Sequence, residues 1–122
     1  MKKLIFTFVA MQLVFVAGDS WAAADGAGAG MNDCSEFIDL YENGDAALRE
    51  DLLLGVGQWA IGYMTGLNAR VEEYERRELG VFDPTTLGDD ILVKCYNAPG
   101  DMIINVATLM YLAAPAYQPS VS

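Results

Sequence analysis

Histidine is absent from the 122-residue sequence, and cysteine occurs only twice. Catalysis needs an acid, a base, a nucleophile or a metal, and the serines and threonines of this chain have no neighbouring base. Two acidic clusters, Glu72-Glu73-Glu75 and Asp89-Asp90, do not follow the spacing of a calcium loop. We therefore expect a protein that is not an enzyme and that holds no cofactor and no metal ion.

The first 24 residues have the pattern of a secretory signal peptide. Two lysines precede an uncharged apolar run over residues 4–18, and small residues precede the expected cleavage sites after Ala22 or Ala24. The run of about 15 residues is shorter than the roughly 20 that span a bilayer. We therefore expect export to the periplasm, no membrane contact after cleavage, and a flexible glycine-rich leader over residues 25–32.

Basic side chains are scarce. Without the first 24 residues, 16 acidic and 5 basic side chains remain, which give a net charge of −11. Such a charge repels nucleic acid and anionic lipid surfaces, and it favours either solubility or a basic partner. Because carboxylic acids have ordinary pKa values around 4, acidification to about pH 2 would turn this charge into about +5. Without histidine, sensing near pH 6 is not expected.

The two cysteines, Cys34 and Cys95, form an even pair in a chain that we expect to enter an oxidising compartment. They are not in a Cys-x-x-Cys arrangement, which argues against a redox or metal pair. We expect one disulfide between them. Closing a loop of about 60 residues would stabilise the fold by roughly 4 kcal/mol in the chain-entropy model.

Capping signals divide residues 33–114 into four or five helices, so the fold class that we expect is all-α, a small bundle stapled by one disulfide. The first helix is predicted from Cys34 to about Glu42, and another starts after Asp45. Gly55 and Gly57 are expected to break or bend the path of that second helix. The predicted helix caps are Asn32 or Asp33, Asp45, Asp83 and Asp101.

A central helix is predicted from Val56 to Asn68, with an extension to about Leu79. Its glycines, Gly62 and Gly66, are one turn apart, and each costs roughly 1 kcal/mol of helix propensity relative to alanine. We expect them to let a neighbouring helix approach the backbone, although the same spacing also occurs in membrane dimers. The face expected to be buried carries Trp59, Tyr63, Leu67, Arg70, Val71 and Tyr74.

The predicted extension alternates charge signs, and it pairs Glu72 with Arg76 and Glu73 with Arg77 at a spacing of four residues. Gly80 is expected to end it. The next helix starts at Asp83-Pro84, with proline at the first helical position, where its missing N–H costs nothing. On that helix we expect Leu87, Ile91 and Cys95 to face the core and Asp89 and Asp90 to face water.

The last predicted helix, from Met102 to about Ala114, is apolar nearly all round. Such a helix is either central to the core or makes contacts beyond its own monomer. A dimer interface and a masked client-binding surface therefore stay open beside core burial. The candidate residues for such a surface are Ile103, Ile104, Val106, Leu109, Met110 and Tyr111. Residues 115–122 are expected to form a loose tail.

Three landmarks of the sequence are Cys34 followed by Phe37-Ile38, the block Trp59-Ala60-Ile61-Gly62-Tyr63-Met64-Thr65-Gly66-Leu67-Asn68, and Cys95 with Pro99 four residues later. Together they resemble the HdeA/HdeB family of small periplasmic acid-stress chaperones. The resemblance implies an HdeA-like helical domain over residues 33–114 and a homodimer that opens in acid. It also implies that the opened protein binds unfolded periplasmic proteins without ATP.

Two other functions fit the sequence. One is a periplasmic immunity protein that blocks a cell-wall amidase toxin of a type VI secretion system, because an acidic face suits a cationic active-site rim. Its partner would be a single protein, bound tightly at neutral pH. The other is a structural periplasmic protein with no client.

Overall fold

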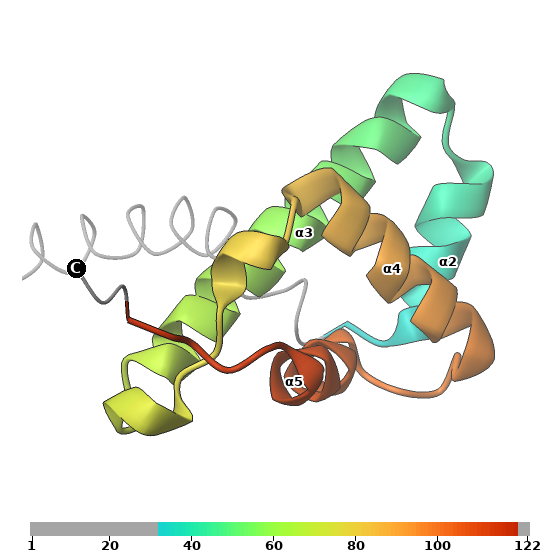
Figure 1. Ribbon diagram of the computed structural model, residues 1–122. Helices are drawn as coiled ribbons and strands as arrows, with labels where there is room; N and C mark the ends of the chain where they lie inside the picture. Colours follow the sequence, from blue (N-terminus) through green and yellow to red (C-terminus); the bar gives the residue numbers. More distant parts are fainter. Residues whose placement is uncertain (1–31, 120–122) are drawn as a thin grey trace, which may run out of the picture.

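The computed structural model describes residues 32–119, and these residues contain four α-helices and two short 3₁₀-helices. Figure 1 shows α3 as the long diagonal helix, with α4 and α2 on one side of it and α5, seen nearly end-on, below α4. The predicted all-α class and the disulfide are confirmed. The predicted signal peptide and residues 25–31 of the predicted leader lie outside the described residues. The elements are α2 (Cys34–Asn43), α3 (Ala46–Asn68), η1 (Glu73–Glu75), η2 (Leu79–Val81), α4 (Pro84–Asn97) and α5 (Ile103–Ala113).

The predicted starts of three helices are confirmed by their caps. The carboxylates of Asp33, Asp45 and Asp83 accept hydrogen bonds from backbone N–H groups at the beginning of α2, α3 and α4. Pro84 occupies the first turn of α4, as expected. These local signals set the helix starts because each cap satisfies an N–H that has no partner within its helix.

The prediction of a break at Gly55 and Gly57 is wrong, because α3 is one continuous helix of 23 residues. The buried positions on α3 are Val56, Gly57, Ala60 and Met64, and they form one stripe against the core. Packing of this stripe against the core keeps the chain helical across Gly55 and Gly57, because tertiary contacts override weak helix propensity.

The close approach expected at Gly62 and Gly66 occurs instead at Gly57 and Gly88. A Cβ atom placed on Gly57 would collide with the carbonyl group of Pro84, and one on Gly88 would collide with the carbonyl group of Leu53. A Cβ atom on Gly62 or Gly66 would meet nothing within 4 Å. Helices α3 and α4 therefore cross in direct backbone contact at two glycines, one from each helix, while Gly62 and Gly66 lie on the open side of α3.

The helix face that we predicted to be buried lies beside the face of α3 that is buried in the structure. Trp59, Tyr63 and Leu67 are half-buried. The rings of Trp59 and Tyr63 stack with centroids 5.3 Å apart, and the Tyr63 hydroxyl lies 2.7 Å from Thr108 Oγ1 on α5. These side chains connect α3 to α5 at the margin of the core.

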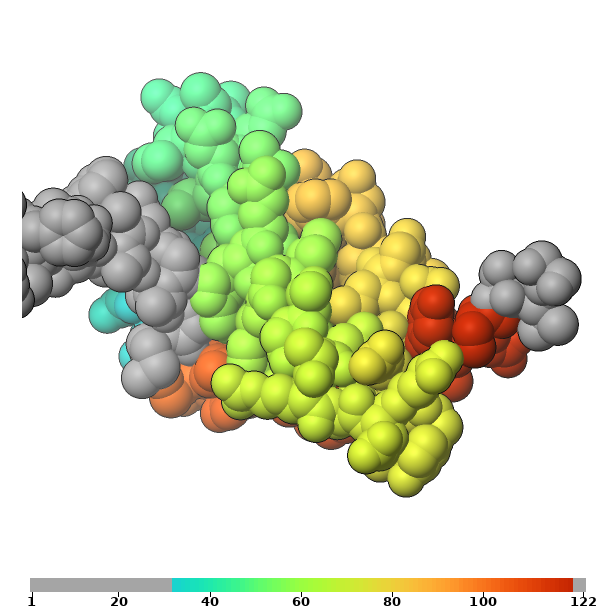
Figure 2. All heavy atoms as spheres, turned by 90° about the vertical axis from the view of Figure 1, so that its left-hand side faces the viewer, coloured from blue at the N-terminus to red at the C-terminus, as the bar shows by residue number. Residues whose placement is uncertain are grey.

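The predicted helical extension over residues 69–79 is wrong, since α3 ends at Asn68 and the chain continues through turns. The spacing of Glu72 with Arg76 and of Glu73 with Arg77 therefore does not place these pairs on a helix face. Gly80 lies inside η2 and does not end a long helix. In Figure 2 the yellow-green part of segment 69–82 lies beyond the lower end of α3, and Figure 1 shows that the chain then returns so that η2 lies alongside α3.

The predicted loose tail is fastened as far as Tyr117. The Pro115 carbonyl accepts a hydrogen bond from Glu78 N–H at 2.8 Å, and Tyr117 N–H donates to the Arg76 carbonyl at 2.8 Å. Arg77 and Ala116 form an antiparallel bridge between these two bonds. The chain leaving α5 therefore runs back along segment 69–82, as Figures 1 and 2 show.

The core of the described residues consists of apolar side chains and the disulfide, and no polar or charged side chain is buried there. Helix α4 supplies Leu87, Ile91, Leu92 and Cys95, which confirms its predicted inner face. Asp89 and Asp90 are exposed, as expected. Helices α2, α3 and α5 close around this inner face of α4.

We predict opposite effects for alanine at the two kinds of glycine. Gly57→Ala and Gly88→Ala should each lower the free energy of unfolding by about 3 kcal/mol or more, because the new methyl group meets backbone that cannot move aside. Gly62→Ala and Gly66→Ala, the matched controls, should raise it by about 0.5–1 kcal/mol through helix propensity. Urea unfolding followed by circular dichroism measures all four. Equal effects at the two kinds of position would contradict the α3–α4 backbone contact.

Candidate functional site

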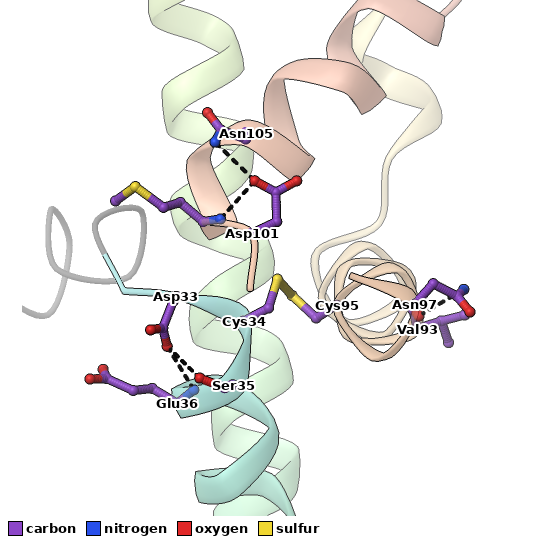
Figure 3. Close-up of a disulfide and its surroundings, with 10 residues drawn as sticks. Asp33, Cys34, Ser35, Glu36, Val93, Cys95, Asn97, Asp101 and Asn105 are labelled. Atoms are coloured by element: carbon purple, nitrogen blue, oxygen red, sulfur yellow. Dashed lines mark hydrogen bonds between the residues drawn. A yellow bond between two sulfur atoms is a disulfide. The ribbon is translucent and has the colours of Figure 1, made fainter. Parts of the chain in front are cut away.

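The disulfide joins the beginning of α2 to the last turn of α4. Cys34 and Cys95 are both fully buried, and their Cα atoms are 4.9 Å apart. Beside the bridge, Cys34 N–H donates to the Asp101 carbonyl at 2.7 Å, and Ile103 N–H donates to the Asn32 carbonyl at 3.1 Å. Figure 3 shows the bridge close to the turn that contains Asp101. Asn32, predicted as the last leader residue, is thus part of the fold.

An aspartate stands at the beginning of each of the four described α-helices. Asp33 accepts from Glu36 N–H at 3.0 Å, Asp45 from Leu48 N–H at 2.9 Å and Asp83 from Thr86 N–H at 3.1 Å.

Asp101 lies one residue before the N-cap of α5 and accepts from Met102 N–H and from the Asn105 amide, both at 2.9 Å. The predicted cap at Asp101 is therefore displaced by one residue. Figure 3 shows Asp33 and Asp101 with their hydrogen bonds. All four carboxylates stand where the positive end of a helix dipole favours a negative charge.

A polar node fixes the turn after α3. The Asn68 side chain accepts from Arg77 N–H at 2.9 Å and donates to the Arg77 carbonyl at 2.9 Å, so its amide pairs with the backbone as a neighbouring strand would. The same Asn68 oxygen accepts from the Tyr111 hydroxyl at 2.7 Å. The Arg77 guanidinium donates to the Ala114 carbonyl at 3.1 Å. This node ties α3, segment 69–82 and the end of α5 together.

A second polar cluster closes the end of α2. Arg49 donates to the carbonyls of Tyr41 and Glu42 at 2.7 and 3.1 Å, and its guanidinium lies 5.0 Å from the centre of the Tyr41 ring. Tyr96 on α4 donates its hydroxyl proton to Glu42 Oε2 at 3.0 Å. Partial desolvation, together with this hydrogen bond, raises the pKa of Tyr96 above its ordinary value. The last turn of α2 contains no basic residue, and Arg49 of α3 donates to the carbonyls at this helix end instead.

The six candidate surface residues of the last helix fall into two groups. Ile103, Val106 and Tyr111 lie in the core, with no more than 5% of each side chain exposed. Ile104 and Met110 are half-buried, and Leu109 is 63% exposed. In the folded chain these six residues do not form one exposed face, because three of them are buried in the core.

An apolar hollow of about 470 Å³, which we name the α5 groove, lies along the exposed edge of α5. Val81 and Leu109 on its wall are 56% and 63% exposed. Sequence reasoning missed this groove, because segment 69–82 was predicted to be largely helical and solvated. The groove is lined by Val81, Phe82, Lys94, Leu109, Met110 and residues 113–115.

The tip of segment 69–82 presents an aromatic side chain among carboxylates. Tyr74 in η1 is 79% exposed, and Glu72, Glu73 and Glu75 beside it are exposed as well. We name these four residues the acidic tip. An isolated tyrosine this exposed is available as an anchor for a partner protein.

Residues 32–119 contain no cluster of three or more metal-binding side chains. None of the helices in this part of the chain is both long enough and apolar enough to span a bilayer. Comparisons with protein families, with curated proteins and with solved structures gave no match. The resemblance to the HdeA/HdeB family stays a prediction.

We predict that the Asn68 node is a large source of stability. Asn68→Ala should lower the free energy of unfolding by about 3 kcal/mol, because three hydrogen bonds are lost and the hydroxyl group of the buried Tyr111 is left without this partner. Tyr111→Phe removes only one of these bonds and should cost about 1 kcal/mol. Denaturant unfolding of both variants measures the difference. Similar losses for the two variants would show that the backbone of Arg77 does not depend on the Asn68 amide.

Proposed function

We propose that the protein is a periplasmic acid-stress protein of the HdeA/HdeB kind, which binds unfolding proteins at low pH without ATP and without catalysing a reaction. The observation that carries the proposal is the aspartate at the beginning of each described helix. An ionised carboxylate in that position stabilises a helix by about 0.3–1 kcal/mol through its charge and the helix dipole. Protonation of a carboxylate in acid removes this charge and the stabilisation that depends on it.

Loss of these charges weakens all four helices together, while the disulfide still holds α2 to α4. The disulfide does not include α5, which is joined to α4 only through the backbone of residues 98–102, and its inner side chains Ile103, Val106 and Tyr111 are buried. Its displacement in acid would expose both these side chains and the apolar face of α4. Such a surface binds apolar segments of unfolding proteins without any energy source.

The test compares variants that keep the caps but not their charge. Asparagine caps a helix about as well as aspartate, so Asp33→Asn/Asp45→Asn/Asp83→Asn should fold normally at pH 7 and resist acid. The matched control, Asp39→Asn/Asp51→Asn/Asp89→Asn, removes one exposed carboxylate from the interior of each of the same helices. Fluorescence of an apolar dye between about pH 7 and pH 2 reports opening, and light scattering of an acid-labile enzyme reports client binding.

The unaltered protein should suppress client aggregation at about pH 2 to 3, where carboxylates are protonated, but not at pH 7. The capping variant should open at lower pH than the control variant, because its helices lose roughly 1–3 kcal/mol less on acidification. Equal suppression at both pH values would rule out the acid-stress function. Coincident opening curves for the two variants would rule out the caps as its trigger.

The acidic tip favours a second candidate function, the immunity protein that neutralises a type VI secretion amidase toxin. A tyrosine surrounded by three carboxylates suits insertion into a cationic active-site rim. In that case the gene for this protein should lie beside an amidase gene, and the two products should bind at neutral pH. Tyr74→Ala should weaken this binding at least tenfold without loss of stability, whereas Leu40→Ala, which also alters an exposed apolar side chain, should not. Absence of an adjacent amidase gene would remove this candidate.

A further inference from the structure

We propose that the α5 groove binds a single-chain carboxylate amphiphile of the fatty-acid class in the folded protein at neutral pH. The alkyl chain would lie against Leu109, Met110 and Phe82, and its carboxylate would reach the ammonium group of Lys94. This site does not depend on acid opening, so it goes beyond the chaperone function proposed above.

The charge of the groove differs from that of the surrounding surface. Residues 32–119 carry 15 acidic and 5 basic side chains, yet the lining of the groove contains one lysine and no carboxylate. Lys94 is the only lysine in this part of the chain, and it lies in the last turn of α4. An anionic ligand is repelled by most of this protein, and the groove is a place where it meets a cation beside apolar walls.

The apolar wall is exposed to water in the folded chain. More than half of each of the side chains of Val81 and Leu109 is exposed. Covering apolar surface contributes about 25 cal/mol per Å². A hollow of about 470 Å³ is near the small end of the range of ligand pockets, about 300–1,000 Å³. That size suits one alkyl chain better than a lipid with two chains.

Backbone hydrogen bonding at the groove favours an alkyl chain over a peptide. Phe82 N–H donates to the Leu79 carbonyl and Ala114 N–H to the Tyr111 carbonyl, both at 3.1 Å. The carbonyls of Ala114 and Pro115 accept from Arg77 and Glu78. A peptide would bring its own N–H and C=O groups into the groove, where these four backbone groups already have partners, and burying an unpaired polar group is costly. An alkyl chain has no such groups.

The experiment titrates the ¹⁵N-labelled protein with decanoate at pH 7.5 and follows the backbone resonances. Binding should saturate at one decanoate per chain with a dissociation constant on the order of 100 μM, and the shifted amide resonances should be those of residues 81–82, 94, 109–110 and 113–114. Decyltrimethylammonium, which has the same chain length and a positive head group, is the matched control ligand and should bind at least fivefold more weakly.

Four variants at three positions test the two parts of the site. Lys94→Met keeps an apolar stem but removes the charge, and it should weaken decanoate binding about fivefold, whereas Lys94→Arg should restore it. Leu109→Gln should weaken binding about tenfold, and Leu40→Gln, at a similarly exposed position on α2, should leave it unchanged. All three positions are exposed, so the four variants should fold, and circular dichroism checks this.

Several results would overturn the proposal. They are a lack of saturation, equal binding of the two amphiphiles, an unchanged affinity in Lys94→Met, and resonance shifts centred on α3. None of these results bears on the acid-stress function, because the titration is done in the closed fold at neutral pH.

Discussion

The backbone contact between α3 and α4 is the constraint on which the rest of the structure depends. Gly57 and Gly88 let the two helices approach until the backbone of each meets the other. This contact sets the distance at which Val56, Ala60 and Met64 meet Leu87 and Ile91 in the core. Helix α2 is then joined to α4 by the disulfide, and α5 covers the remaining apolar side of both long helices.

The boundaries that sequence reasoning predicted well are those set by local chemistry. The caps at Asp33, Asp45 and Asp83 were predictable because a side chain three residues away decides whether an N–H is satisfied. The disulfide was predictable because the chain has only two cysteines. The inner face of α4 followed from helical spacing alone, and its residues Leu87, Ile91 and Cys95 are buried as expected.

The features that sequence reasoning missed are decided by contacts between distant residues. The sequence does not distinguish a helical glycine that faces another helix from one that faces water, so it predicts a break at Gly57 and a close contact at Gly62, and both predictions are wrong. The end of α3 depends on Asn68 binding the backbone of Arg77, nine residues later, which no periodicity shows. The α5 groove needs residues 81, 94 and 109 to meet, and only the arrangement of the helices brings them together.

Both ends of the described chain are held by partners that are far away in sequence. Residues 32–35 bond to residues 99–103, and residues 115–117 bond to residues 76–78. Closing such long loops is entropically unfavourable until the intervening chain is in place. During synthesis, a growing polypeptide therefore cannot complete this fold before its last helix has emerged.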